Sequence, residues 1–157
     1  MAGASLDTFD RAILWELQTD NRQSNARIGS TVGLSEPSVR RRIRRLRKDG
    51  HIIADVSLVE PGRLGITVIV LVRFEKESQA TYDAFKKEMR ATARIAQCYT
   101  VTGDEDFILV GHFPDMASYD QWVNDRLLTN PAISRSTTHV VYRRTKFETA
   151  IPTALDG

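Results

Sequence analysis

The chain has 157 residues, of which 41% are hydrophobic, so it can form one medium-sized domain or two small ones with buried cores. Its single cysteine, Cys98, excludes a disulfide within the chain, and its longest apolar run, Val68–Val72, is too short to cross a membrane. The formal net charge is only +2, but residues 1–55 contain ten Lys/Arg against seven Asp/Glu, and residues 56–157 contain twelve against thirteen, so the positive excess lies in the first third.

The first 50 residues predict three short helices. Residues 6–20 place their apolar side chains on one helical face, with Asp7 as the N-cap. A second helix is expected over residues 24–32, and Gly33 after it suits a left-handed C-cap. Ser35 can then cap a third helix. A glycine turn between two short helices is typical of a helix-turn-helix.

Residues 40–48 form the most basic segment, because seven of these nine residues are Arg or Lys. Val39, Ile43 and Leu46 recur at i, i+4 and i+7, so they can face a core and leave the arginines on the outer surface. Arginine there can bind phosphates or the O6 and N7 atoms of guanine. The alternative is a solvated basic face, which the glycine turn and the charge asymmetry disfavour. The predicted DNA-binding residues are Ser35, Ser38, Arg40, Arg41, Arg42, Arg44, Arg45 and Lys48.

Not every basic residue of this helix can reach DNA bases. Some must contact phosphate, and others are expected to pair with acids such as Glu16 or Asp49.

The chain changes character after Glu60-Pro61-Gly62, which breaks an extended segment over residues 51–59. We expect a helix-turn-helix domain over residues 1–54, a linker over 55–65, and a second domain with a C-terminal tail over 66–157. In this second domain we expect strands over 66–74, 95–102, 107–113 and 133–143, and helices over 80–93 and 116–128. The order βαββαβ describes a ferredoxin-like sandwich, so the predicted fold class is α+β.

Several motifs follow one another between residues 6 and 152. The first helix opens with Leu6-Asp7-x-x-Asp10-x-x-Ile13-Leu14, and the third contains Val39-x-x-Arg42-Ile43-x-x-Leu46. Val59-Glu60-Pro61 comes next, and Val101-Thr102-Gly103-Asp104-x-Asp106-Phe107 follows. In this order and spacing the motifs resemble the Lrp/AsnC family, the leucine-responsive and asparagine-type transcriptional regulators of bacteria and archaea.

The resemblance implies a winged helix-turn-helix for DNA and a ferredoxin-like domain that senses amino acids. It also implies dimers, which often assemble further into rings. The family's third helix usually begins with a Pro-Thr-Pro-Cys-like run, whereas this chain has Glu36-Pro37-Ser38-Val39, so its base readout is expected to differ.

A second candidate site is the turn over residues 102–106. Asp104 or Asp106 could accept from the ammonium of an amino acid, and backbone N–H groups near Gly103 could bind its carboxylate. Hydroxyls that alternate along the last strand could contribute as well. The spacing alone favours an ordinary hairpin turn, and the family resemblance favours the ligand site. The predicted effector-binding residues are Thr102, Gly103, Asp104, Asp106, Ser136 and Thr138.

Other chemistries find little support in the sequence. The three histidines lie far apart with no cysteine or carboxylate at ligand spacing, so we expect no metal site and no cofactor. Cys98 is best explained as an apolar filler, with a redox role as the unsupported alternative. Nothing pairs a nucleophile with a base, which argues against an enzyme. Residues 1–5 lack the features of a signal peptide, so we expect a cytoplasmic protein that does not bind membranes.

These observations predict a transcriptional regulator that binds double-stranded DNA and an amino-acid effector. The segment Val68–Val72 is apolar on both sides of its strand, which predicts a second sheet stacked on the first, hence a homodimer. The family resemblance adds an octamer made of four dimers as the larger assembly. The alternative is an architectural DNA-binding protein that needs no small molecule.

Overall fold

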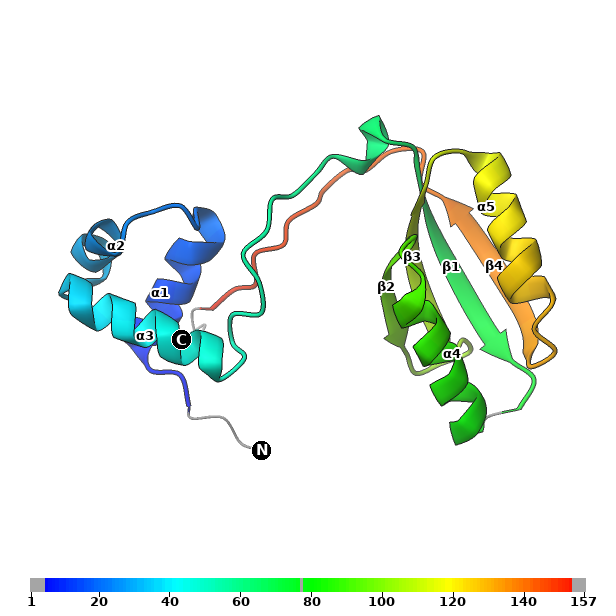
Figure 1. Ribbon diagram of the computed structural model, residues 1–157, viewed down its shortest axis with the longest axis horizontal. Helices are drawn as coiled ribbons and strands as arrows, with labels where there is room; N and C mark the ends of the chain where they lie inside the picture. Colours follow the sequence, from blue (N-terminus) through cyan, green and yellow to red (C-terminus); the bar gives the residue numbers. More distant parts are fainter. Residues whose placement is uncertain (1–4, 77, 154–157) are drawn as a thin grey trace. The chain divides into compact units, whose positions relative to one another are not determined.

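The computed structural model describes residues 5–76 and 78–153, which fall into two compact units (Figure 1). The first unit contains the described residues up to Leu58 together with those from Lys146 onward, and the second is Val59–Thr145. The division near Leu58 falls inside the predicted linker. The tail differs from the expectation, because it belongs to the first unit rather than to the ferredoxin-like one.

Three helices form the body of the first unit: α1 (Thr8–Thr19), α2 (Asn25–Val32) and α3 (Glu36–Lys48). Their ends lie close to the predicted ones, because each start has a residue suited to the N-cap position. Asp7 and Ser24 accept hydrogen bonds from the first turns of α1 and α2. The three helices share one core, which contains Ile13, Leu14, Ile28, Val39, Ile43 and Leu46.

The predicted helix-turn-helix is confirmed, but the predicted wing is not observed. No residue among the described part of the first unit, 5–58 and 146–153, is in a β-strand. Residues 52–58 carry no regular structure, because a strand needs a neighbour to complete its hydrogen-bond ladder and the unit provides none.

The C-terminal tail binds along α1. The side-chain amide of Gln18 donates to the carbonyl of Ile151 at 3.0 Å and accepts from the Ile151 N–H at 2.7 Å. Arg11 donates to the carbonyl of Thr153 at 3.2 Å, and the Thr153 hydroxyl donates to the carbonyl of Arg11 at 2.9 Å. These four hydrogen bonds explain why the tail groups with the helices of the first unit.

The second unit has the predicted βαββαβ order. Its elements are β1 (Ile66–Phe74), α4 (Gln79–Ala91), β2 (Ile95–Thr100), β3 (Phe107–Phe113), α5 (Met116–Val123) and β4 (Ile133–Val140), preceded by a 3-10 turn over Pro61–Arg63. The strands form one antiparallel sheet in the order β2-β3-β1-β4, which confirms the ferredoxin-like fold. The helix predicted over residues 116–128 ends where expected, although its last five residues, Asn124–Leu128, are π-helical. Three elements end earlier than predicted: α4 at Ala91, β2 at Thr100 and β4 at Val140.

The two faces of the sheet have different surroundings. Helices α4 and α5 cover one face, where Val68, Val70, Val72 and Phe74 of β1 are buried (Figure 1). The opposite face, which we call the open face, has no covering helix within the described residues of the second unit. On this face Ile69 and Leu71 of β1 lie beside Val110 and Ile108 of β3, and all four are only half-buried. The apolar character on both sides of β1 is therefore confirmed.

Candidate nucleic-acid interface and effector turn

A tight elbow joins α2 to α3 and sets the direction of the basic helix. Gly33 ends α2 with a φ of 75°, in the left-handed region that favours glycine. Gly29 is buried one turn earlier, and a Cβ at that position would lie only 2.4 Å from the carbonyl oxygen of Leu34. A side chain at position 29 would therefore collide with the backbone of the elbow.

Two serines mark the start of α3. Ser35 occupies the N-cap position with an extended backbone, but its hydroxyl donates to the hydroxyl of Ser38 at 3.0 Å. No helix N–H is bonded to the Ser35 side chain, so the predicted side-chain cap is wrong. Both serines lie at the N-terminal end of α3, next to the elbow. Ser35 is exposed and Ser38 is half-buried.

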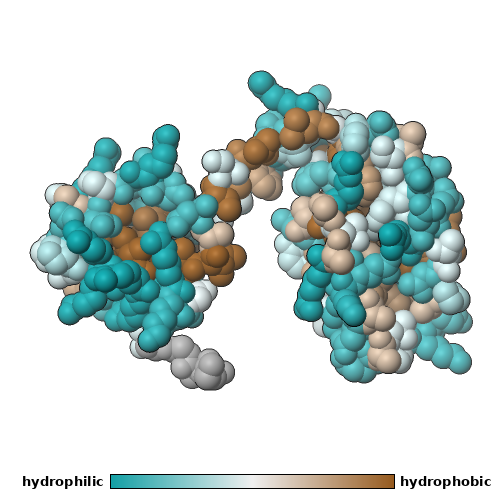
Figure 2. Space-filling view, in the orientation of Figure 1, coloured by the Kyte–Doolittle hydropathy of each residue, from teal (hydrophilic) through white to brown (hydrophobic). Residues whose placement is uncertain are grey.

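One stripe of α3 points away from the core. Val39, Ile43 and Leu46 are at most 6% exposed, as predicted. Arg41, Arg44 and Lys48, spaced i, i+3 and i+7, follow the opposite side of the helix and are exposed. In the described part of the chain none of these three has a carboxylate partner. We call them the outer stripe, and Figure 2 shows hydrophilic side chains gathered over α3.

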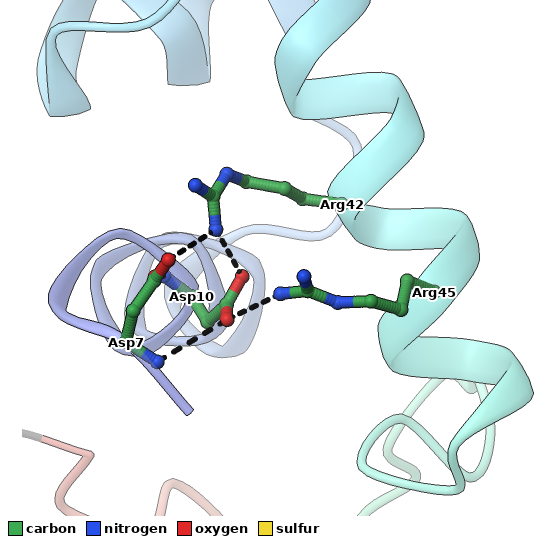
Figure 3. Close-up of polar contacts among 4 residues, drawn as sticks. All are labelled: Asp7, Asp10, Arg42 and Arg45. Atoms are coloured by element: carbon green, nitrogen blue, oxygen red, sulfur yellow. Dashed lines mark hydrogen bonds and ion pairs between the residues drawn. The ribbon is translucent and has the colours of Figure 1, made fainter. Parts of the chain in front are cut away.

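Two other arginines of α3 turn toward α1 and bind a buried carboxylate (Figure 3). Asp10 is 1% exposed. Its Oδ1 accepts from Nη1 of Arg42 at 2.8 Å, and its Oδ2 accepts from Nη2 of Arg45. Arg42 also donates to Asp7 at 2.7 Å, and its guanidinium lies 5.5 Å from the centre of the Phe9 ring. We call this group of charges the aspartate clamp.

The aspartate clamp also closes the N-terminus of α1. The Asp10 N–H donates to Asp7 at 2.7 Å, and the Asp7 N–H donates back to Asp10 at 3.3 Å, which is a reciprocal capping box. The Asp10 N–H and then the Arg42 guanidinium lower the pKa of Asp7 below its ordinary value of 3.8, because both stabilise the carboxylate. Hydrogen bonds from Arg42 to Asp7 and Asp10 likewise raise the pKa of Arg42.

The expectation that all arginines of the run lie outward is therefore wrong for Arg42, whose side chain is only 18% exposed. Arg45 remains half exposed, at 46%, but one end of its guanidinium is bound. The expected partner acids were also wrong. Arg40 pairs with Glu36 at 2.5 Å and Arg47 with Asp55 at 2.7 Å, rather than with Glu16 or Asp49.

In the turn over residues 102–106, Asp106 is bound by its own chain. Its Oδ2 accepts from the N–H of Phe74 at 2.6 Å, and its Oδ1 accepts from the hydroxyl of Tyr82. Its own N–H donates to the carbonyl of Val72 at 2.9 Å. Because both carboxylate oxygens already have donors, Asp106 anchors the turn to β1 and α4.

The rest of the turn is more open. Thr102, Gly103 and Asp104 are exposed, and Gly103 has a φ of 116°, which favours glycine. Ser136 and Thr138 share one face of β4, as expected, but it is the helix-covered one, because they pair with the buried residues Val72 and Val70. The structure brings Ser136 next to the strand that Asp106 binds. The Thr138 hydroxyl is bonded to Tyr119 of α5, and Thr138 lies two residues further along β4.

The remaining candidates behave as packing residues. Cys98 contacts the core of the second unit, and burial raises the pKa of its thiol, which disfavours the reactive thiolate. Trp122 packs against Phe113 and Tyr119. Across the described ranges no three His, Cys, Asp or Glu side chains come together as metal ligands would. None of the described helices has the length and apolar character needed to cross a membrane.

Sequence reasoning missed Asp10 as the partner of Arg42 and Arg45, and Tyr82 as the partner of Asp106. The first contact spans 32 residues and the second 24. No periodic pattern connects residues at such separations. The available signal was Asp10 itself, a charged residue on the apolar side of an amphipathic helix.

Comparison with known proteins places both units in one family. Residues 6–47 match the AsnC-type helix-turn-helix domain, and residues 67–151 match the Lrp/AsnC ligand binding domain. An uncharacterised HTH-type transcriptional regulator of Sinorhizobium fredii is 39% identical over 149 residues, covering 94% of this chain and 88% of the relative. The leucine-responsive regulatory protein of Escherichia coli is 34% identical over 146 residues, covering 92% and 89%.

Solved structures give the same relationship. A transcriptional regulator of Neisseria meningitidis, crystallised with L-methionine, superposes with a TM-score of 0.84 at 28% identity, covering 94% of this chain and 97% of its own. An AsnC family regulator of Agrobacterium tumefaciens gives the same TM-score, identity and coverage.

The aspartate clamp predicts a large effect of a small substitution. Asp10→Asn keeps the size of the side chain but leaves a single oxygen acceptor for two guanidinium groups, so a partly buried charge loses its partner. We expect the free energy of unfolding to fall by roughly 2–4 kcal/mol, measured by urea denaturation followed by circular dichroism.

Glu36→Gln is the matched control, because it breaks the exposed ion pair with Arg40. We expect it to change the free energy of unfolding by less than about 0.5 kcal/mol. Equal effects of the two substitutions would mean that the aspartate clamp contributes no more than a surface ion pair.

Proposed function

This chain belongs to the Lrp/AsnC family of transcriptional regulators, and from that premise we propose that it is a sequence-specific DNA-binding dimer controlled by an amino acid or related metabolite. As a member of this family it is a regulator rather than an enzyme. The observation that carries the DNA-binding proposal is the outer stripe of α3, whose positive charges have no carboxylate partner in the described chain. We place this activity in the cytoplasm.

The DNA contacts divide by position on α3. Ser35, Ser38 and Arg40 lie at the end of α3 nearest the elbow, and recognition helices place this end against base edges in the major groove. Arg41, Arg44 and Lys48 continue along the exposed side, where they can meet phosphates or guanine. Arg42 and Arg45 contribute indirectly, since they fix α3 against α1, and the exposed part of Arg45 adds charge.

The outer stripe predicts a defined salt dependence. Arg41→Gln and Arg44→Gln each remove one positive charge without touching the core. We expect each to weaken binding to the chain's own promoter region, and to reduce the slope of log K against log salt by about one for each lost phosphate contact. Fluorescence anisotropy at several salt concentrations measures both quantities.

Lys87→Gln, on the exposed side of α4, is the control and should leave the slope unchanged. Equal affinity for the promoter and for unrelated DNA would favour the alternative, an architectural DNA-binding protein, for which the concentration of seven basic residues on one helix is the supporting observation. Unchanged slopes in both arginine variants would contradict the assignment of the outer stripe.

The open face of the sheet supports the dimer. Its centre is formed by Ile69, Leu71, Ile108 and Val110, and β4 adds Thr137 and His139 beside them. A half-buried apolar sheet face of this kind is stabilised by covering it. A second copy of the chain has the same open face. Two copies related by a two-fold axis can therefore pack their open faces against each other, so that both are covered. Two α3 helices related by that axis could then bind successive major grooves. Four such dimers could assemble into an octamer.

The dimer predicts that a charge on the open face is disruptive. Ile69→Asp would place a carboxylate against the partner sheet, and we expect the variant to be monomeric at micromolar concentration by size-exclusion chromatography with light scattering. Ala84→Asp, on the exposed side of α4, is the control and should keep the mass of the wild-type chain. A dimeric, folded Ile69→Asp variant would exclude this face as the interface.

The turn over residues 102–106 supports the effector site. A free amino acid needs an acceptor for its ammonium, and Asp104 is exposed there with no partner among the described residues. Asp106 contributes by holding the turn, and the backbone around Gly103 can approach a ligand closely. Thr102 in the turn, and Ser136 and Thr138 on the helix-covered face of β4, are the further candidate hydroxyls. The L-methionine complex of the related Neisseria regulator agrees with a ligand of this class.

The effector proposal predicts that one or more of the twenty amino acids stabilises the chain. A ligand that binds only the folded state raises the free energy of unfolding by about 2.7 kcal/mol when present at a hundred times its Kd. A thermal-shift screen of the full chain detects such a rise, and light scattering with the hit shows whether the assembly changes. No shift with any amino acid would remove the effector from the proposed function.

A further inference from the structure

Two arginines face each other at one end of the open face. Arg73 near the end of β1 and Arg135 in β4 are directly opposite partners in the antiparallel ladder, so their side chains leave the sheet on the same side. Arg73 alternates with Leu71 and Ile69, which places both arginines on the open face. Both are exposed.

Nothing in the sheet neutralises this arginine pair. The four strands contain no Asp or Glu at all. Among the described residues neither arginine has a carboxylate within ion-pair distance, whereas Arg126 and Arg144 of the same unit are paired with Glu88 and Glu60. Like charges directly opposite each other on neighbouring strands destabilise a sheet. A second copy stacked on the open face would bring the same strands, and therefore no strand carboxylate either.

The arginine pair lies beside the candidate effector turn. Asp106 donates its N–H to Val72 and accepts from the N–H of Phe74, so it binds the residues on both sides of Arg73. The ladder between β1 and β4 is irregular here, and Ser134 is the extra residue, with its hydroxyl donating to the carbonyl of Arg73 at 3.2 Å. Such bulges redirect side chains and are common next to binding sites.

We propose that Arg73 and Arg135 together bind the carboxylate of a small zwitterionic ligand whose ammonium is bound at Asp104. The inference rests on the proposed effector function and names the groups that recognise the acid end of the effector. Two guanidinium groups offer planar N–H donors that match the two oxygens of a carboxylate. The bound anion also relieves the repulsion between the arginines, so ligand binding and sheet stability are coupled.

The test compares Arg73→Gln and Arg135→Gln with Arg90→Gln, a control on the exposed side of α4. Without ligand and at low salt, both sheet variants should melt at the same temperature as the wild-type chain or above it, because a like-charge contact is removed. Isothermal titration should show the best amino acid from the screen binding roughly 10–100-fold more weakly to each sheet variant. Arg90→Gln should bind it as the wild-type chain does.

A second ligand separates recognition of the carboxylate from general weakening of the site. The amine that lacks the α-carboxylate of the hit should bind the wild-type chain and the sheet variants with equal affinity. A hit with the same Kd in wild-type, Arg73→Gln and Arg135→Gln proteins overturns the inference and leaves the effector proposal intact.

If no amino acid binds the wild-type chain, the effector proposal fails and inorganic phosphate and acetate become the probes. Saturable stabilisation of the wild-type chain by either anion, lost in both sheet variants, would support an anion site at the arginine pair. Absence of that stabilisation would overturn the inference.

Discussion

The buried carboxylate of Asp10 fixes the helix that carries the proposed DNA contacts. Apolar packing of Val39, Ile43 and Leu46 determines which side of α3 faces the core. Asp10 then holds Arg42 and Arg45 from α1, and so connects the start of α1 to the middle of α3. A carboxylate that is 1% exposed is stable only with its charge satisfied, so losing either arginine leaves one buried oxygen of Asp10 without its guanidinium donor.

The two candidate sites are built in the same way. In each, one aspartate has both carboxylate oxygens bound by its own chain: Asp10 by two arginines, and Asp106 by the Phe74 N–H and the Tyr82 hydroxyl. The groups left for a partner are exposed neighbours, namely the outer stripe of α3 in one unit and Asp104 with the arginine pair in the other. An aspartate whose oxygens already accept hydrogen bonds, next to charged groups without a partner, gives a site that is rigid before its ligand binds.

The first unit contains the C-terminal tail, which is far from the three helices in the sequence. After β4 the chain returns to α1, where Gln18 and Arg11 bind residues 151 and 153. The chain therefore passes between the two units twice, near residues 58 and 145. An effector that binds two assembly states with different affinity shifts the population between them. In the proposed function, these two covalent connections link each helix-turn-helix unit to the assembly that the effector would shift.

The sequence by itself determined the helices and strands and which side of each faces a core. The bounds of β1 and β3 follow from short, continuous apolar runs between turn-forming segments, and the starts of the helices follow from residues suited to the N-cap. The motifs also determined the family, because their order and spacing persist along the chain. Local periodicity and turn chemistry act over a few residues, so a single sequence displays them directly.

Only the tertiary structure decided which charges pair, where the tail binds and that no wing strand forms in the described part of the first unit. Asp10 meets Arg42 across 32 residues, Gln18 meets Ile151 across 133, and Arg73 faces Arg135 across two strands. Packing of the backbone determines which of these side chains come within hydrogen-bond distance. The sequence alone offers several acids as partners for each arginine. That packing separated Arg42, which binds Asp7 and Asp10, from Arg41, which has no carboxylate partner in the described chain and is a proposed DNA contact.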